Sequence, residues 1–309
     1  MSNVFLVAAI KNALVGLLLI GIVYAGACLF LFVRQRRMIF VPSSTLASTP
    51  SDRGLPYEDV WISVASDSKT SEPGERIHGW WVPAADPHGV ILYLHGNGEN
   101  ISANIAYAER FHRLGFSVLM IDYRGYGLSD GRLPSEAYAY DDAIAAWNYL
   151  QYQRGVEPRQ IVLYGHSLGG AIALDLAIKQ PSAAGLIVEG TFTSIQDVID
   201  RIRFYRLFPI SWLLNQRFES ISKMRSLQIP ILIMYGMQDA VIPPDMSESL
   251  YAIAPEPKQL LMVPLAGHNN LADIAGDEYT RSLQQFMTLI GMSCLKDDVE
   301  SEQVDVIVE

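Results

Sequence analysis

The chain has 309 residues, of which 50% are hydrophobic and 18% are charged, and its formal net charge is −10. This length suits one large domain with additions, and an acidic chain without a basic cluster excludes a nucleic-acid-binding groove. The two cysteines, Cys28 and Cys294, lie near opposite ends, so no structural disulfide is expected, and no Cys/His spacing indicates a metal site. We expect neither a metal nor a cofactor.

The first predicted element is an apolar helix near the N-terminus. Residues 13–33 form an uncharged stretch of 21 residues, which as a helix covers roughly 30 Å, the thickness of the hydrocarbon core. A cleaved signal peptide would have a shorter apolar region and a small-residue cleavage site, whereas Arg34-Gln-Arg-Arg37 follows here. The apolar residues after Cys28 argue against a lipoprotein signal, and apolarity all round argues against a buried core helix. Residues 1–40 are therefore predicted to be an uncleaved membrane anchor with the lipid bilayer as its partner.

The charges that flank this segment predict its orientation. Arg34, Arg36 and Arg37 follow it, and Lys11 with the α-amino group precedes it. Basic flanks remain in the cytoplasm, so an excess of about one charge favours a single-pass membrane protein with a cytoplasmic C-terminal domain.

Three further segments follow the anchor. Residues 41–56 contain Pro42, Pro50 and Pro56 among Ser, Thr and Gly, which is typical of a linker. Residues 57–292 form the predicted globular domain. The acidic tail, residues 293–309, is predicted to be disordered.

Within the domain, apolar runs alternate with helical patterns. Strands are expected at 60–64, 77–82, 90–94, 117–121, 161–164, 186–188, 229–235 and 260–263, and helices at 103–114, 135–152, 171–178 and 277–290. The first two strands are expected to be antiparallel. The remaining apolar strands, separated by helices, indicate an α/β fold in which helices cover both faces of a mostly parallel sheet.

A segment at about 193–218 interrupts this alternation. It is rich in Ile, Leu, Phe, Tyr and Trp and carries Arg201, Arg203 and Arg206. It is expected to be a short helical insertion above the strand ends. Two interpretations stay open: a helix that simply covers the sheet, or a cap that shapes the substrate site.

The segment Gly165-His166-Ser167-Leu168-Gly169 predicts a nucleophile. It lies between an apolar strand and a helix, and G-x-S-x-G in that context forms a nucleophile elbow. The glycines permit a strained turn and close packing of the strand and the helix. The hydroxyl of Ser167 would then stand above the sheet edge at a helix N-terminus.

A serine hydroxyl needs a base, and a base needs an orienting acid. Asp239 and His268 each follow a predicted strand, and the order Ser, Asp, His is that of the α/β-hydrolases. His268 is the predicted base and Asp239 the predicted acid. Glu189 and Asp245 compete as the acid, but Glu189 is expected to be structural or pocket-lining, and Asp245 to interact with a helix dipole.

The negative oxygen of a tetrahedral intermediate needs two hydrogen-bond donors. One is expected to be the backbone N–H of Leu168, and the other to come from the loop at 95–100, where Asn97 is the best candidate. An ordinary turn between a strand and a helix is the alternative for that loop. Gly96 and His166 flank these positions and are expected to contact the substrate.

Six motifs in this order resemble those of the α/β-hydrolases. They are His95-Gly-Asn-Gly98, Asp122-Tyr-Arg-Gly-Tyr-Gly127, Gly165-His-Ser-Leu-Gly-Gly170, Glu189-Gly-Thr-Phe-Thr-Ser194, Asp239 with Ile242-Pro-Pro244, and Gly267-His-Asn269. The chain resembles the serine-aminopeptidase-like branch of this superfamily, and with its anchor it is similar to the membrane-anchored α/β-hydrolase domain-containing protein 13 type. The resemblance implies the α/β-hydrolase fold, Ser167, Asp239 and His268 as a triad, and Asn97 and Leu168 in the oxyanion hole. It also implies a structural role for the Asp122 motif, in which Arg124 ties loops together.

These features predict a membrane-anchored serine hydrolase that cleaves small-molecule carboxylic esters or thioesters through an acyl-enzyme. A serine peptidase or amidase of the same fold is one alternative, and a non-catalytic, membrane-tethered binding module is another. A dehalogenase or epoxide hydrolase would need an aspartate in place of Ser167. No feature of the sequence indicates an oligomeric state.

Overall fold

The sheet has eight strands in the order β1-β2-β4-β3-β5-β6-β7-β8. The computed structural model describes residues 2–64, 74–131 and 133–292. The strand bounds are β1 Glu58–Ser63, β2 Arg76–Val82, β3 Val90–Leu94, β4 Ser117–Ile121, β5 Ile161–His166, β6 Gly185–Glu189, β7 Ile231–Gly236 and β8 Lys258–Val263. β2 pairs antiparallel with β1 and β4, and all other neighbours are parallel. The predicted mostly parallel sheet is therefore confirmed.

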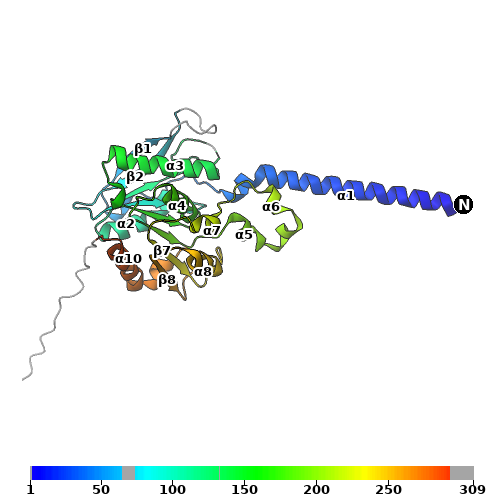
Figure 1. Ribbon diagram of the computed structural model, residues 1–309. Helices are drawn as coiled ribbons and strands as arrows, with labels where there is room; N and C mark the ends of the chain where they lie inside the picture. The colour runs from blue at the N-terminus through cyan, green and yellow to red at the C-terminus, as the bar shows by residue number, and fades with distance from the viewer. Residues whose placement is uncertain (1, 65–73, 132, 293–309) are drawn as a thin grey trace, which may run out of the picture.

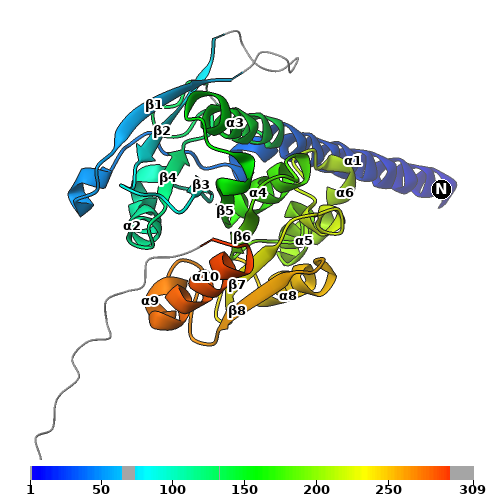
Figure 2. The ribbon, with the colours of Figure 1, turned by 60° about the vertical axis from the view of Figure 1, so that its left-hand side comes forward.

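Helices cover both faces of the sheet (Figures 1 and 2). On one face lie α3 (Glu136–Asn148), α4 (Leu168–Lys179) and α8 (Pro244–Ile253), and on the other α2 (Ile105–Arg113), α9 (Leu271–Ala275) and α10 (Asp277–Leu289). Successive side chains of a strand point to opposite faces. In β3, accordingly, Leu92 and Leu94 enter the core under α4, whereas Ile91 and Tyr93 enter the core under α2.

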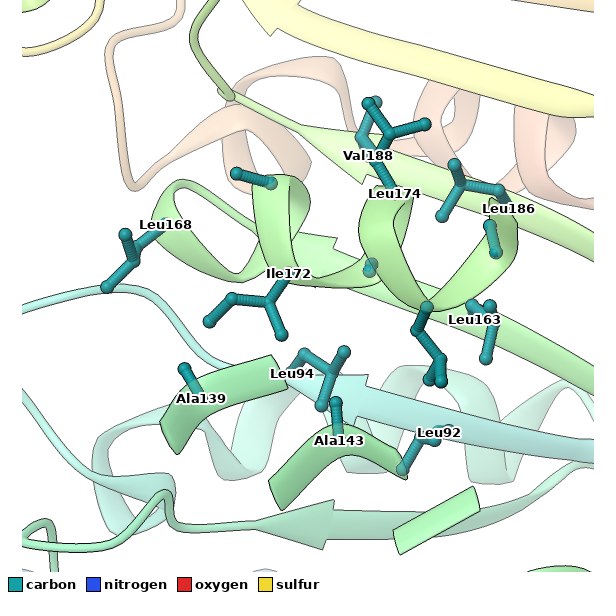
Figure 3. Close-up of a cluster of buried hydrophobic side chains, with 14 of the residues drawn as sticks. Leu92, Leu94, Ala139, Ala143, Leu163, Leu168, Ile172, Leu174, Leu186 and Val188 are labelled. Atoms are coloured by element: carbon teal, nitrogen blue, oxygen red, sulfur yellow. The ribbon is translucent and has the colours of Figure 1, made fainter. Parts of the chain in front are cut away.

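α4 is the most enclosed of these helices, and Figure 3 shows its packing. Its side chains Leu168 and Ile172 lie near Leu94 of the sheet, and Ala139 and Ala143 present the facing side of α3. The small residues on α3 let the two helices approach closely, which fixes α4 against the ends of β3, β5 and β6.

The remaining short elements are η1 Pro50–Arg53, η2 Ile101–Asn104, η3 Tyr149–Gln153, η4 Pro158–Gln160 and α7 Ser220–Met224. Two of them modify the predicted helix ends. The helix expected at 103–114 is preceded by the turn of η2, and the one expected at 135–152 closes with the single π-helical turn η3. The strand expected at 229–235 begins only at Ile231, because Pro230 has no N–H to donate to the sheet.

The N-terminal helix α1 (Ser2–Ile39) projects from the domain (Figures 1 and 2). Residues 5–39 are long and apolar enough to cross a membrane. The residue after α1, Phe40, is buried and its ring packs 6.0 Å from that of Phe218. The C-terminal end of α1 is therefore held in the core of the domain.

Residues 41–56, for which the sequence predicts a linker, lie along the domain. The carbonyl of Ser43 accepts hydrogen bonds from the N–H of Gly127 (2.9 Å) and from Asn100 Nδ2 (3.1 Å). The N–H of Ala47 donates to Ser102 Oγ over 2.9 Å. The tail predicted at 293–309 lies outside the described residues.

The insertion between β6 and β7 contains α5 (Ile195–Asp200), η5 (Arg203–Leu207) and α6 (Ile210–Leu213). It projects from the domain beside the C-terminal part of α1 (Figure 1). The Nε2 of Gln35 on α1 donates to the carbonyl of Leu213 over 3.0 Å, and its Oε1 accepts from the N–H of Asn215 over 2.7 Å. This pair of bonds fixes the insertion against α1.

Candidate active site

Ser167 occupies the sharp turn between β5 and α4. Among the described non-glycine residues, only Ser167 and Phe218 have a positive φ, and Ser167 has φ 54° and ψ −117°. A serine in this region is strained, which is typical of a functional turn. Gly165 and Gly169 make the turn possible, because a Cβ on Gly165 would lie 2.2 Å from the Gly169 carbonyl oxygen, and one on Gly169 would lie 2.0 Å from that of Leu94.

The structure brings Ser167, His268 and Asp239 together. His268, after β8, has its Nε2 3.0 Å from Ser167 Oγ and its Nδ1 2.7 Å from Asp239 Oδ2. Asp239, after β7, is held by its other oxygen, which accepts the N–H groups of Val241 (2.8 Å) and Ile242 (2.7 Å). The carboxylate therefore has a fixed orientation and one oxygen free to accept from the imidazole.

The two competing acids lie elsewhere. Glu189 is buried, and its carboxylate accepts hydrogen bonds from the hydroxyls of Tyr107 (3.0 Å), Tyr279 (2.9 Å) and Tyr164. This set of three donors saturates the carboxylate beneath the site, in keeping with the structural role expected for it. Asp245 is half exposed and forms an ion pair with Arg201 of the insertion.

His166 lies behind His268. Its ring centroid is 5.1 Å from that of His268, and its Nε2 donates to the His268 carbonyl oxygen over 3.2 Å. Burial lowers the pKa of the His166 imidazole, so the ring is neutral at pH 7. Neutral His166 thus supports the backbone of the predicted base.

Leu168 and Asn97 both lie beside the same cavity as Ser167. The N–H of Leu168 is the first of α4, and the first N–H groups of a helix have no acceptor within it. The side chain of Asn97 is engaged: Oδ1 accepts from the N–H of Val41 (3.0 Å) and the hydroxyl of Tyr126 (2.8 Å), and Nδ2 donates to the Ile39 carbonyl. Because Nδ2 is held by the Ile39 carbonyl, the backbone N–H of Asn97 is the better candidate donor to an anion beside Ser167.

A cavity of about 300 Å³ opens beside Ser167. Its walls come from the elbow, the insertion and the last turns of α1. They are lined by Leu31, Gln35, Met38, Ile39, Asn97, Ser167, Leu168, Phe192, Ile195, Val198, Ile199, Ile202, Tyr205, Ile210, Leu213, Leu214, Val241 and Ile242. Neither Gly96 nor His166, both expected to contact substrate, is in this lining; Gly96 instead packs against His166 and Ser167, where a Cβ would lie 3.1 Å from His166 Nδ1.

The contribution of α1 was not predicted from the sequence. Leu31, Gln35 and Met38 lie four and three residues apart, so they share one face of the helix. That spacing is visible in the sequence, but the run around it is apolar on every side, which hides the face that meets the domain.

The Asp122 motif contacts both ends of the loop at 95–100, because the Tyr123 hydroxyl donates to the His95 carbonyl over 3.0 Å. The buried guanidinium of Arg124 pairs with Asp142 of α3 (2.6 Å) and Glu75 (3.0 Å). Asp122 Oδ1 accepts the N–H of Ile101 over 2.9 Å. These bonds tie three loops together, as expected for Arg124. Within the described ranges no cluster of three His, Cys, Asp or Glu side chains could hold a metal ion.

Comparison with known proteins places the chain in a family. The serine aminopeptidase (S33) family model matches residues 85–226. The α/β-hydrolase domain-containing protein WAV2 of Arabidopsis thaliana is 31% identical over 254 residues, 76% of this chain and 80% of that protein. The yeast (Saccharomyces cerevisiae) protein YNL320W, described as an uncharacterized membrane protein, is 33% identical over 244 residues, 77% of this chain and 82% of that protein.

Among solved structures, the Pyrococcus furiosus esterase Pf2001 matches with a TM-score of 0.66 and 18% identity, over 81% of this chain and 98% of that chain. At that identity the likeness shows the fold alone. The relative WAV2, at 31% identity over 76% of this chain, identifies the chain as a member of the α/β-hydrolase family. The protein is a hydrolase of this family with one N-terminal helix that could span a membrane.

Proposed function

We propose that the protein is a membrane-anchored serine hydrolase that cleaves carboxylic ester or thioester bonds through an acyl-enzyme. The observation that carries this proposal is the hydrogen-bonded series from Ser167 Oγ to His268 (3.0 Å) and from His268 to Asp239 (2.7 Å). Each member has the partner that its role requires: a hydroxyl beside a base, and a base beside a fixed carboxylate.

In the first half of the reaction, Ser167 Oγ attacks the carbonyl carbon while His268 Nε2 takes the hydroxyl proton. Asp239 stabilises the resulting imidazolium through Nδ1. The backbone N–H groups of Leu168 and Asn97 receive the negative oxygen, and the positive end of the α4 dipole adds to this stabilisation. His268 then returns the proton to the leaving alcohol or thiol.

In the second half, water attacks the acyl-enzyme. His268 takes a proton from the water, and the same two N–H groups hold the second tetrahedral intermediate. Collapse of this intermediate breaks the bond to Ser167, and His268 returns the proton to its oxygen. The acid is released and the serine is regenerated, so no cofactor is needed for balance.

The cavity favours an acyl group over a peptide N-terminus. Its lining contains no Asp or Glu side chain among the described residues, whereas recognition of an α-ammonium group calls for a carboxylate. Isoleucine, leucine and aromatic side chains dominate instead. A peptidase or amidase of the same fold is therefore the less favoured reading.

The exposed apolar surface of α1 supports membrane anchoring. The yeast relative of this protein, YNL320W, is described as a membrane protein, which supports it as well. The two hydrogen bonds of Gln35 to the insertion argue against removal of α1 as a signal peptide, because cleavage would leave their partners without α1. The flanking arginines favour a cytoplasmic domain.

The test is labelling by a fluorophosphonate probe together with hydrolysis of p-nitrophenyl acetate. Wild type should be labelled and should hydrolyse the ester, and Ser167→Ala should lose both while retaining the wild-type circular dichroism. Labelling of Ser167→Ala at the wild-type level would exclude Ser167 as the nucleophile. A wild-type protein that neither reacts with the probe nor cleaves the ester would favour a non-catalytic, membrane-tethered module.

A further inference from the structure

We propose that the substrate is a bilayer lipid ester, and that its acyl chain reaches Ser167 laterally from the membrane, along α1. This inference rests on the proposed hydrolase activity and adds to it the class of substrate and its route. In this arrangement α1 acts as one wall of the acyl-binding cavity as well as an anchor. Three observations support it, and each concerns a different part of the cavity.

The first observation is the stripe of α1 that faces the insertion. Leu31, Gln35 and Met38 line the cavity, and Cys28, one turn earlier on the same face, is half buried. The residues between them, such as Leu29 and Phe30, are exposed. One face of the helix therefore meets the insertion, while the remaining faces are free to contact lipid.

The second observation is how far along α1 the insertion reaches. The hydroxyl of Tyr24 donates to the carbonyl of Leu207 over 3.0 Å, and the rings of Tyr24 and Phe208 stack with centroids 5.7 Å apart. Tyr24 lies 15 residues before Ile39, or about 22 Å along the helix axis. The insertion thus accompanies α1 well into its apolar stretch.

The length of α1 beyond this contact fixes its level in the bilayer. Residues 2–23 of α1 remain, and their 22 residues cover about 33 Å, enough for the hydrocarbon thickness of about 30 Å. This level lies closer to the N-terminus than the span expected at 13–33, and it requires the long side chain of Lys11 to reach toward the far headgroups. Tyr24 and the end of the insertion then lie at the boundary between the hydrocarbon and the headgroups. Tyrosine and tryptophan are enriched at that level.

The third observation is the surface of the insertion at this end. Phe204 and Leu207, here called the tip surface, are 60% and 67% exposed, and Phe204 packs against Phe208, whose ring stacks on Tyr24. The tip surface is continuous with the exposed apolar faces of α1 through the Tyr24 contact. The exposed Arg203 and Arg206 lie in the same segment, as expected for an element that inserts apolar side chains beneath anionic headgroups. Because the tip surface continues the surface of a membrane-spanning helix, we infer that it contacts lipid.

The cavity extends along α1 from the nucleophile as far as Leu31, about 10 Å from Tyr24 along the helix axis. Ser167 lies at its inner end, and Leu31, Ile202 and Leu213 line it where α1 and the insertion meet. An acyl chain on this route would pass from the lipid along the exposed apolar side chains of α1, such as Phe30, into the cavity at Leu31. A route through water would instead expose the acyl chain to solvent, at a cost of about 25 cal/mol for each Å² of apolar surface.

The test narrows the cavity from the α1 side in the full-length protein held in lipid nanodiscs. Leu31→Trp should lower kcat/KM for p-nitrophenyl palmitate, which partitions into the disc, by about tenfold or more. The kcat/KM for p-nitrophenyl acetate should fall by much less, so that the ratio of the two values shifts toward acetate, because an acetyl group needs only the part of the cavity nearest Ser167. The matched control is Leu29→Trp on an exposed face of α1, which should leave both values unchanged.

The result separates this inference from the hydrolase activity. If the wild type cleaves the acetate ester but Leu31→Trp leaves the palmitate value unchanged, the lateral route is wrong and the hydrolase stands. If Leu29→Trp impairs palmitate hydrolysis as strongly as Leu31→Trp, the α1 wall is also wrong. Absence of acetate hydrolysis and of probe labelling in the wild type would instead remove the hydrolase itself.

A second measurement tests the tip surface without any reaction. A tryptophan introduced at the tip surface by Leu207→Trp should be quenched in nanodiscs by lipids brominated in the upper part of the acyl chains, so the fractional quenching should exceed that of the wild type. Tyr152→Trp, at an exposed position outside the insertion and α1, is the control and should not exceed the wild-type quenching. Equal fractional quenching in the wild type and Leu207→Trp would show that residue 207 does not enter the bilayer, and would overturn the proposed docking.

Discussion

Asn97 receives, through its side-chain oxygen, a 3.0 Å hydrogen bond from the N–H of Val41, the second residue beyond α1. Its backbone N–H is the proposed donor to the negative oxygen at Ser167. One residue thus connects the end of the N-terminal helix to the oxyanion loop. A displacement of α1 relative to the domain would be transmitted to the position of this N–H.

This link predicts a catalytic defect from a change that leaves every proposed catalytic atom in place. Asn97→Ala removes the bonds to Val41, Tyr126 and Ile39 while keeping the backbone N–H. We expect kcat to fall by about tenfold with a smaller change in KM, because misplacing one oxyanion donor affects the transition state more than the bound substrate. Steady-state kinetics on a p-nitrophenyl ester measure this, with Tyr126→Phe as the control that keeps the Val41 bond. A kcat equal to wild type would mean that the link does not position the loop.

The identity of the acid can be tested with two asparagine substitutions. Asp239→Asn cannot stabilise the imidazolium of His268 and favours the wrong tautomer, so kcat should fall by roughly 10³–10⁴-fold. Asp245→Asn affects only a half-exposed ion pair with Arg201 and should change kcat by less than about twofold. Equal effects of the two substitutions would refute the assignment of Asp239.

The strained turn predicts that a glycine at the nucleophile position stabilises the fold. Ser167 has a positive φ that costs a non-glycine residue about 1–3 kcal/mol, and the greater flexibility of glycine in the unfolded chain offsets part of the gain. Ser167→Gly should therefore be about 1 kcal/mol more stable to unfolding than Ser167→Ala. Both variants lack the nucleophile, so chemical denaturation compares them directly. A less stable Ser167→Gly would show that the turn stores no strain.

The burial of His166 predicts how stability depends on pH. Burial lowers the pKa of its imidazole in the folded state, so the unfolded chain binds a proton first as the pH falls below about 6.5. The contribution of His166 to stability is therefore present above that pH and is lost as the pH falls through the folded-state pKa. His166→Gln should flatten the decline of Tm between about pH 6.5 and pH 5. Parallel Tm curves for the two proteins would contradict this.

Much of the architecture follows from short continuous apolar runs and from motif order. β3 and β4 have the predicted bounds, because both are short apolar runs that a parallel sheet buries on both faces. The proximity of Ser167, Asp239 and His268 could be predicted because each follows a parallel strand, and the carboxyl ends of such strands share one edge of the sheet.

The cavity could not be predicted in the same way. The contacts of Gln35 with the insertion join residues about 180 positions apart, and no local pattern encodes them. The sequence predicts Asn97 as an oxyanion donor for its place in a glycine-containing loop, yet two of the partners that hold its side chain lie 56 and 58 residues earlier. Sequence patterns specify which faces are apolar, whereas the pairing of faces depends on the whole chain.

The two anchoring points of α1, Gln35 at the base and Tyr24 farther out, hold the insertion at a set height and tilt. An enzyme fixed in this way meets its substrate only within the plane of the membrane. The substrate concentration that sets its rate is therefore the mole fraction of the substrate among the neighbouring lipids. Diluting the substrate with inert lipid should then slow turnover, even when the amount in the test tube is constant. Dispersal of the same membrane into a larger volume of buffer should leave the rate for each molecule unchanged.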